Sequence, residues 1–182
     1  MKTEKAEIKV FLASSDELVM ERIHIGDLFN DINSILAETP VRVRLLKWEA
    51  FDPSFKGNRK QAEYNDQIKR ADIFIALFRT RAGEFTKEEA GAAKDLHIQN
   101  KKPSALYCFI HDCHEKREFD IDELKADLGT DFINDTFKNI DDLELKVVKI
   151  LEARLGDCGI TVNDTGKFIQ IGPVNILRKK TI

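Results

Sequence analysis

The stretch DIFIALFRTRAGEFTKEEAGAA, residues 72–93, decides the fold. Its apolar run 73–78 is short and rich in β-branched and aromatic residues, which predicts a strand buried on both faces. A polar segment with one glycine follows, and then Thr86, with Glu89 three residues later, fits a capping box that opens a helix. Ligands of open α/β sheets bind at the carboxyl ends of strands, so Glu88 and Glu89 are candidate functional carboxylates.

Strand and helix signals alternate along the rest of the chain. The first strand ends in Ser14, Ser15 and Asp16, which can cap the helix that follows. The second begins with strict apolar–polar alternation, which is typical of a strand. The predicted strands are 8–13, 41–48, 72–78 and 104–110, and the predicted helices are 16–36, 61–70, 86–99, 121–128 and 140–155. This order predicts a flavodoxin-like doubly wound parallel sheet, an α/β fold with helices on both faces.

The composition limits the class of protein. With 182 residues, 42% hydrophobic and 34% charged, the chain can form one packed domain and is too apolar for global disorder. A net charge of −3 with scattered basic residues argues against nucleic acid as a partner. The sequence has no run of about 18 apolar residues and no signal peptide, and its three cysteines fit free thiols. We therefore expect a cytoplasmic protein that does not bind membranes.

The last residues and a group of potential metal ligands need separate interpretation. From residue 156 the sequence changes to two or three short strand-like runs broken by glycines. We therefore expect a domain over 1–155 and a tail over 156–182, or a linker to a further module. Two cysteines and two histidines lie within 108–114, but their spacing is not that of a zinc knuckle or ribbon, and we predict no metal site.

These motifs together resemble the TIR (Toll/interleukin-1 receptor) domain, in particular bacterial TIR-like domains at the N-termini of defence and signalling proteins. The likeness covers roughly residues 8–155. It rests on a first strand ending in FLASS (11–15), a second strand running into the aromatic, proline-containing loop 48–53, and a third strand followed by a helix that opens on Thr-x-x-Glu. It implies a bacterial signalling or antiphage-defence protein that acts on NAD+ without a further cofactor.

Many TIR domains cleave the bond between nicotinamide and ribose, so the resemblance implies an NAD+ glycohydrolase. The family's catalytic glutamate stands four residues after an aromatic residue, as Glu89 follows Phe85, and Glu88 is the competing register. Animal members have a serine at the strand end and Trp-Cys before the glutamate, where this chain has Phe78 and Phe85-Thr86. A carboxylate beside the ribose can stabilise an oxocarbenium-like sugar. The helix N-terminus is expected to lower the pKa of Glu89 and keep it ionised.

Other groups can bind the dinucleotide. Arginines after the third strand, with Lys56 or Arg59, can meet the pyrophosphate, and N–H groups at the start of the first helix can do the same. An aromatic residue of the second-strand loop can stack on a ring, although such residues are more often structural anchors. The candidate NAD+-binding residues are Ser14, Ser15, Trp48, Phe51, Phe78, Arg79 and Arg81.

Three functions are compatible with this pattern. The first is an NAD+-consuming enzyme that is active when copies assemble, with loop 49–60 mediating self-association and closing the site of a neighbour. The second is a non-catalytic TIR module that signals by homotypic contact. The third is an enzyme like the nucleoside 2-deoxyribosyltransferases, in which a glutamate in a comparable helix is a covalent nucleophile. A fused or separate sensor module would trigger assembly in the first case.

Overall fold

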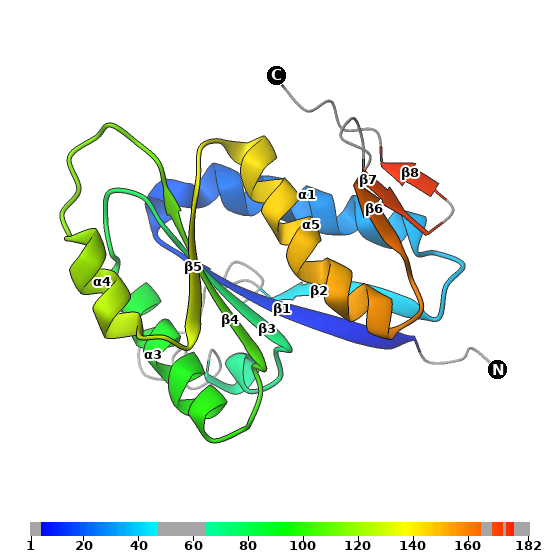
Figure 1. Cartoon of the computed structure of the whole chain (residues 1–182), viewed down its shortest axis with the longest axis horizontal. Helices are drawn as coiled ribbons and strands as arrows, with labels where there is room; N and C mark the ends of the chain where they lie inside the picture. Colours follow the sequence, from blue (N-terminus) through cyan, green and yellow to red (C-terminus); the bar gives the residue numbers. More distant parts are fainter. Residues whose placement is uncertain (1–4, 47–64, 165–168, 173, 177–182) are drawn as a thin grey trace, which may run out of the picture. The chain divides into compact units, whose positions relative to one another are not determined.

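The computed structural model describes residues 5–46, 65–164, 169–172 and 174–176. The chain divides into two compact units. One is drawn from Met1–Ile8, Ile23–Arg44 and Asn139–Ile182, and the other from Lys9–Arg22 and Leu45–Lys138. The main sheet has five parallel strands in the order β2-β1-β3-β4-β5 (Figure 1). This is the flavodoxin-like order, so the structure confirms the predicted fold class.

The elements follow the predicted alternation, with one additional strand. The main sheet consists of β1 (Ala6–Ser14), β2 (Val41–Leu46), β3 (Ile73–Phe78), β4 (Ala105–His111) and β5 (Phe132–Phe137). The helices are the short 3-10 helix η1 (Asp16–Leu18), α1 (Val19–Ile35), α3 (Glu84–Ile98), α4 (Ile121–Leu128) and α5 (Ile140–Asp157). Of the predicted helix 61–70, the described part is helical over 65–68. No helix within the described ranges is long and apolar enough to cross a membrane.

The central strand β3 is buried along its whole length. It pairs in parallel with β1 on one side and with β4 on the other. All six of its side chains are at most 1% exposed. Because successive side chains of a strand point to opposite faces, both faces of the sheet are covered here, as the apolar run 73–78 predicts.

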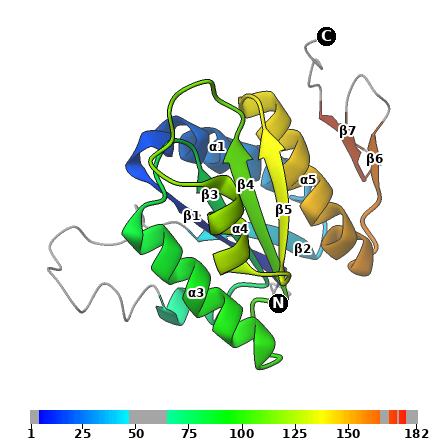
Figure 2. The ribbon, with the colours of Figure 1, turned by 60° about the vertical axis from the view of Figure 1, so that its left-hand side comes forward.

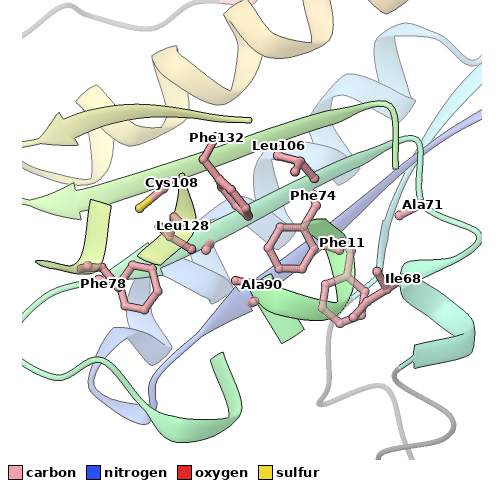
Figure 3. Close-up of a cluster of buried hydrophobic side chains, with 14 of the residues drawn as sticks. Phe11, Ile68, Ala71, Phe74, Phe78, Ala90, Leu106, Cys108, Leu128 and Phe132 are labelled. Carbon is pink, nitrogen blue, oxygen red and sulfur yellow. The ribbon is translucent and has the colours of Figure 1, made fainter. Parts of the chain in front are cut away.

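Helices α3 and α4 pack on the same face of the sheet (Figures 1 and 2). The core on this face centres on Phe74, whose ring stacks on Phe11 with centroids 5.6 Å apart and meets the edge of Phe132 at 6.1 Å (Figure 3). Helix α3 contributes Ala90 and Ala93, small residues that allow the helix to approach the strands closely. Full burial of one such phenylalanine stabilises the fold by about 1.5–3 kcal/mol.

Asp72 connects the amino ends of β3 and β4 with Lys9 of β1. Its amide donates to the carbonyl of Lys9 at 2.8 Å, and its carboxylate accepts from the Lys9 amide at 2.8 Å. Its own carbonyl accepts from the Ser104 amide at 3.0 Å. Lys102 completes the group through an ion pair with the Asp72 carboxylate. The starts of β3 and β4 are therefore held in register with Lys9 of β1, at the edge opposite to the carboxyl ends of the strands.

Strand β5 is absent from the sequence prediction. Its sequence, FINDTF, has only its two phenylalanines buried, and it forms one edge of the sheet. Its partner is β4, with Leu106 opposite Phe132 and His111 opposite Phe137. An edge strand needs fewer apolar residues than a central one, so its sequence gives a weak strand signal.

The unit that includes Ile23–Arg44 and Asn139–Ile182 contains most of α1, helix α5 and a small second sheet. Asn33 of α1 fastens β2 by donating to the Val43 carbonyl at 2.8 Å and accepting from the Val43 amide at 2.9 Å. Strands β6 (Val162–Asp164), β7 (Ile169–Ile171) and β8 (Val174–Ile176) form a three-stranded antiparallel sheet. These strands correspond to the strand-like runs expected after residue 156, while the domain boundary at 155 stays a prediction.

Candidate active site

The carboxyl ends of β1 and β3 are adjacent, because Ser14 pairs with Leu77 in the parallel register. The chain passes from β1 to β2 on one side and returns to β3 on the other. This is the topological switch point of the sheet, where open α/β proteins bind their ligands. The loops after β1 and β3 therefore form the candidate site.

Glu17 joins these two loops. Its carboxylate accepts from the backbone amides of Thr80 at 3.0 Å and Arg81 at 2.9 Å, from the Thr80 hydroxyl, and from the Ser15 hydroxyl at 3.1 Å. Partial burial raises the pKa of Glu17, but these hydrogen bonds outweigh it and leave the pKa below its usual value of 4.5. The carboxylate thus stays ionised and holds the loops together. No sequence motif singles out Glu17.

Arg22, which is 1% exposed, fixes the end of β1. Its Nη1 donates to the Ser14 hydroxyl and to the Ser15 carbonyl, both at 2.8 Å. Ser15 is the N-cap residue of η1, but its side chain makes no capping hydrogen bond, contrary to the prediction. The first turn also carries Asp16 and Glu17, two carboxylates that disfavour an anion at this helix start. Pyrophosphate binding by the Ser14 and Ser15 amides stays a prediction.

Helix α3 begins two residues before the predicted start. Its N-cap is Gly83, and the Lys87 amide already donates to the Gly83 carbonyl at 3.0 Å. Thr86 is therefore inside the first turn and 2% exposed, and the N-cap residue Gly83 has no side chain that could cap the helix. The predicted capping box of Thr86 and Glu89 is wrong, because the chain becomes helical before Thr86 and turns both side chains inward.

Glu89 is a buried acid, with 7% of its surface exposed. Burial, and then the nearby charge of Glu88, raise the pKa of Glu89 to about 7. The expected lowering by the helix N-terminus is wrong, because Glu89 lies in the second turn, where desolvation outweighs the helix dipole. Among the described residues its carboxyl has no hydrogen-bond or ion-pair partner.

Burial distinguishes the two candidate glutamates. Glu88 is exposed, whereas Glu89 lies on the inward face with Ala90. Phe85, which defines the family spacing to Glu89, is 71% exposed. The Glu89 carboxyl combines a pKa near neutrality with a shielded environment, and both are properties of acid–base and electrostatic catalysts.

The three predicted binding residues at and just after the end of β3 have different environments. Phe78 is fully buried in the core and presents no surface to a ligand. Arg81 is exposed, and its Nε lies 3.3 Å from a carboxylate oxygen of Glu118. Arg79 is half-buried, and its Nη2 donates to Glu115 at 3.1 Å. Arg79 is therefore better placed than Arg81 to contact a ligand at the sheet edge.

Some predicted residues lie outside the described part of the chain. They belong to the loop after β2, which includes the segment expected to mediate self-association. These residues are Trp48, Phe51, Lys56 and Arg59, and the segment is 49–60. Their assignments as ligand or assembly contacts stay predictions.

The cysteine- and histidine-containing segment shows no metal arrangement. Across the described ranges, no group of three or more His, Cys, Asp or Glu side chains is placed to hold a metal ion. Cys108 is buried within β4, and this burial raises the pKa of its thiol to about 12. Such a thiol stays protonated and packs as a small apolar side chain.

No protein-family model and no curated protein matches the sequence. Solved structures that are similar to this chain include the following three. The CMP N-glycosidase BcmB of Clostridium botulinum has a TM-score of 0.48 and 19% identity, over 79% of this chain and 99% of that chain. Rubredoxin oxygen:oxidoreductase from Desulfovibrio gigas (TM-score 0.43, 16% identity) and a flavodiiron core from Synechocystis (0.43, 13%) each match over 84% of this chain. This chain spans 38% of the length of each of these two proteins.

Proposed function

We propose that the chain hydrolyses the bond between nicotinamide and ribose in NAD+, with Glu89 as its catalytic carboxylate. The observation that carries the proposal is the carboxyl of Glu89, which is buried on the helix that follows the central strand and has no partner among the described residues. Burying such a group weakens a fold, and acids with strongly perturbed pKa values cluster at functional sites. The TIR-like set of sequence motifs supports NAD+ as the substrate.

The reaction needs one well-placed carboxylate. The bond from C1′ of the ribose to the ring nitrogen breaks with both electrons passing to nicotinamide, which leaves as a neutral molecule. Positive charge develops on the sugar, and a carboxylate held beside it stabilises that charge. Water then adds at C1′ and loses a proton to Glu89 or to solvent. The products are nicotinamide, ADP-ribose and one proton.

The raised pKa of Glu89 is compatible with this role because the substrate is cationic. In the free protein the carboxyl is about half ionised near pH 7. The positively charged nicotinamide ring would favour the ionised form and lower the pKa of Glu89 in the complex. Substrate binding would therefore generate the carboxylate that the transition state requires.

The test is nicotinamide release from NAD+ by concentrated or artificially clustered protein, because the TIR resemblance implies activation by self-association. Glu89→Gln keeps the size of the side chain and removes its charge, and Glu88→Gln is the matched control at the exposed neighbouring position. We expect at least about 100-fold loss of turnover for Glu89→Gln and less than about threefold change for Glu88→Gln. Wild-type turnover by a correctly folded Glu89→Gln variant would refute the role of Glu89.

A second candidate is cleavage of a nucleoside or nucleotide N-glycosidic bond. The specific observation in its favour is again the pKa of about 7, since a half-protonated carboxyl can donate a proton to a departing base. Deoxynucleosides and CMP in the same assay separate the candidates: release of free base without NAD+ turnover favours the second. Concentration-dependent self-association with no turnover of any substrate favours a non-catalytic interaction module.

A further inference from the structure

A group of charged side chains lies at the carboxyl ends of β3 and β4. The parallel register pairs the last residue of β3 with the residue before His111, so Arg79 and His111 lie next to each other where the two strands end. The loop after β4 returns to this edge, where the Glu118 amide donates to the Thr80 carbonyl at 2.7 Å. This loop also carries Arg117, so residues far apart in the sequence meet at one edge of the sheet.

Three nitrogen atoms of this group are buried and have no hydrogen-bond partner in the described part of the chain: Nε of Arg79, Nε of Arg117 and Nδ1 of His111. The Nε atom of an arginine always carries a hydrogen, so two of the three are buried donors without an acceptor. Folded proteins rarely leave such donors unpaired, because an unpaired buried donor weakens the fold. A ligand that offers several acceptor oxygens would satisfy them.

Each guanidinium is positioned by one of its other nitrogens. Arg117 donates through Nη2 to the carbonyl of His111 at 2.9 Å. Arg79 donates through Nη2 to Glu115 at 3.1 Å, and the Glu115 side chain is 56% exposed. An ion pair with so exposed a carboxylate contributes little, so an incoming anion can replace it.

We infer that Arg79, Arg117 and His111 bind a phosphate group, as a phosphate monoester or as the diphosphate of a nucleotide. The fork of guanidinium donors matches the spacing of phosphate oxygens, and the imidazole nitrogen supplies a further hydrogen bond. Arg117, and not Arg81, is then the second arginine that binds the phosphate, because Arg81 is exposed and paired with Glu118.

Nearby carboxylates do not exclude an anion here. Asp112 and Glu115 are exposed and can turn toward solvent. The buried carboxylate in the neighbourhood is Glu21, 7% exposed. Glu21 is outnumbered by the two arginines of the cluster, Arg79 and Arg117. The shielded part of the cluster therefore has more positive than negative charge.

The pKa of His111 should respond to a phosphate bound beside it. Burial, and then the nearby Arg79, lower the pKa of His111 below its usual 6.5, while Glu21, Glu115 and Asp112 act weakly in the opposite direction. The ring is therefore neutral at pH 7. A bound phosphate would favour the protonated ring and raise the pKa again.

Binding is measured directly by titrating the full chain with inorganic pyrophosphate in a calorimeter. Arg117→Gln removes the proposed ligand, and Arg81→Gln is the matched control, an exposed arginine with an ion pair nearby. We expect the Kd for pyrophosphate to rise at least about tenfold for Arg117→Gln and less than about twofold for Arg81→Gln. Failure of the wild type to bind millimolar pyrophosphate, or equal weakening by both substitutions, would overturn the inference.

Two further measurements show whether weaker binding by Arg117→Gln comes from the lost ligand or from a damaged fold. Arg117→Lys keeps the charge but lacks the planar fork, so we expect a properly folded variant, checked by circular dichroism, that still binds pyrophosphate several-fold more weakly. An NMR titration of the histidines, with His111→Asn for assignment, should show the pKa of His111 rising when pyrophosphate is added. An unchanged His111 titration at saturating pyrophosphate would place the anion elsewhere and overturn the assignment.

Activity measurements identify the source of the phosphate, and this arm rests on the proposed glycohydrolase function. If the site holds the diphosphate of NAD+, pyrophosphate inhibits competitively and Arg117→Gln raises KM with little change in kcat. If pyrophosphate binds without inhibiting, the site takes a separate phosphate-bearing ligand. Calorimetry tests phosphate binding even if the protein turns over no substrate. The Glu89→Gln assay tests catalysis even if the protein binds no pyrophosphate, so the two proposals can fail separately.

Discussion

Replacing Glu89 by glutamine should make the protein more stable at neutral and alkaline pH while it removes catalysis. The free energy of the folded state includes the unfavourable burial of the Glu89 carboxylate, which has no partner among the described residues. Glutamine has the same shape and carries no charge at any pH. The gain in stability should therefore appear only at a pH where the glutamate is ionised in at least one of the two states.

The sign and size follow from the two pKa values. The pKa of Glu89 is about 7 in the folded protein and 4.5 in its usual state, so the folded state binds the proton more tightly. Wild-type stability then falls as pH rises from about 4.5 through about 7 and levels off above that. Each pH unit between the two pKa values changes the unfolding free energy by about 1.4 kcal/mol. The whole interval therefore corresponds to a loss of about 3 kcal/mol, or roughly 6–12 °C in Tm for a chain of this length.

The assay is urea denaturation of the wild type and the variant at pH 4, 6 and 8, with Glu88→Gln as the exposed control. The difference in unfolding free energy between Glu89→Gln and wild type should grow by about 3 kcal/mol from pH 4 to pH 8. Any penalty for burying the glutamine amide is the same at every pH and cancels in this comparison. A difference that stays constant with pH, or an equal pH dependence in the control, would refute the reasoning.

Three further predictions concern the site and the core. In steady-state kinetics kcat/KM for NAD+ should rise with pH through about 7, because Glu89 ionises there in the free enzyme. The rise in kcat should level off at a lower pH, because bound NAD+ lowers the pKa of Glu89, and a flat kcat/KM profile would exclude Glu89 as the catalytic carboxylate. Glu17→Gln should lower the unfolding free energy at pH 7 by about 1–3 kcal/mol, and by progressively less as pH falls below 4.5 through the lowered pKa of the folded Glu17 carboxyl; Asp16→Asn is the control. Phe74→Ala should lower it by about 3–5 kcal/mol, whereas the exposed Phe85→Ala should change it by less than about 0.5 kcal/mol; similar effects would contradict the core assignment.

The sequence predicts the central part of this fold well. The run 73–78 is apolar at every position because both faces of β3 are buried, and β2 alternates because only one of its faces is. The missed strand, β5, is an edge strand with two buried residues, so its own sequence has neither a continuous apolar run nor a clean alternation. Its pairing with β4 is a long-range interaction that local patterns do not show.

The site is predicted only in part. The sequence singles out Glu89 as a candidate, and its catalytic role stays a prediction. The start of α3 and the sign of the Glu89 pKa shift are not predicted, because both depend on how the helix lies against the sheet. Glu17 is one acidic residue among many, and its role arises from four hydrogen bonds, three of them to groups more than sixty residues away. Arg117 and His111 likewise become neighbours of Arg79 only through strand pairing and loop return.

The contacts of Asp72 bear on how proteins of this type can change over evolution. Because it joins Lys9 of β1 to the starts of β3 and β4 at one edge of the sheet, these strands are fastened at a point away from the loops at the other edge. Segments 79–83 and 112–118 can therefore accumulate substitutions, or be exchanged by recombination, without shifting the strands that carry them. Under the proposed function, substrate preference and the sheet framework would then be separately variable, and a library confined to these two loops would be a practical route to new specificities on this scaffold.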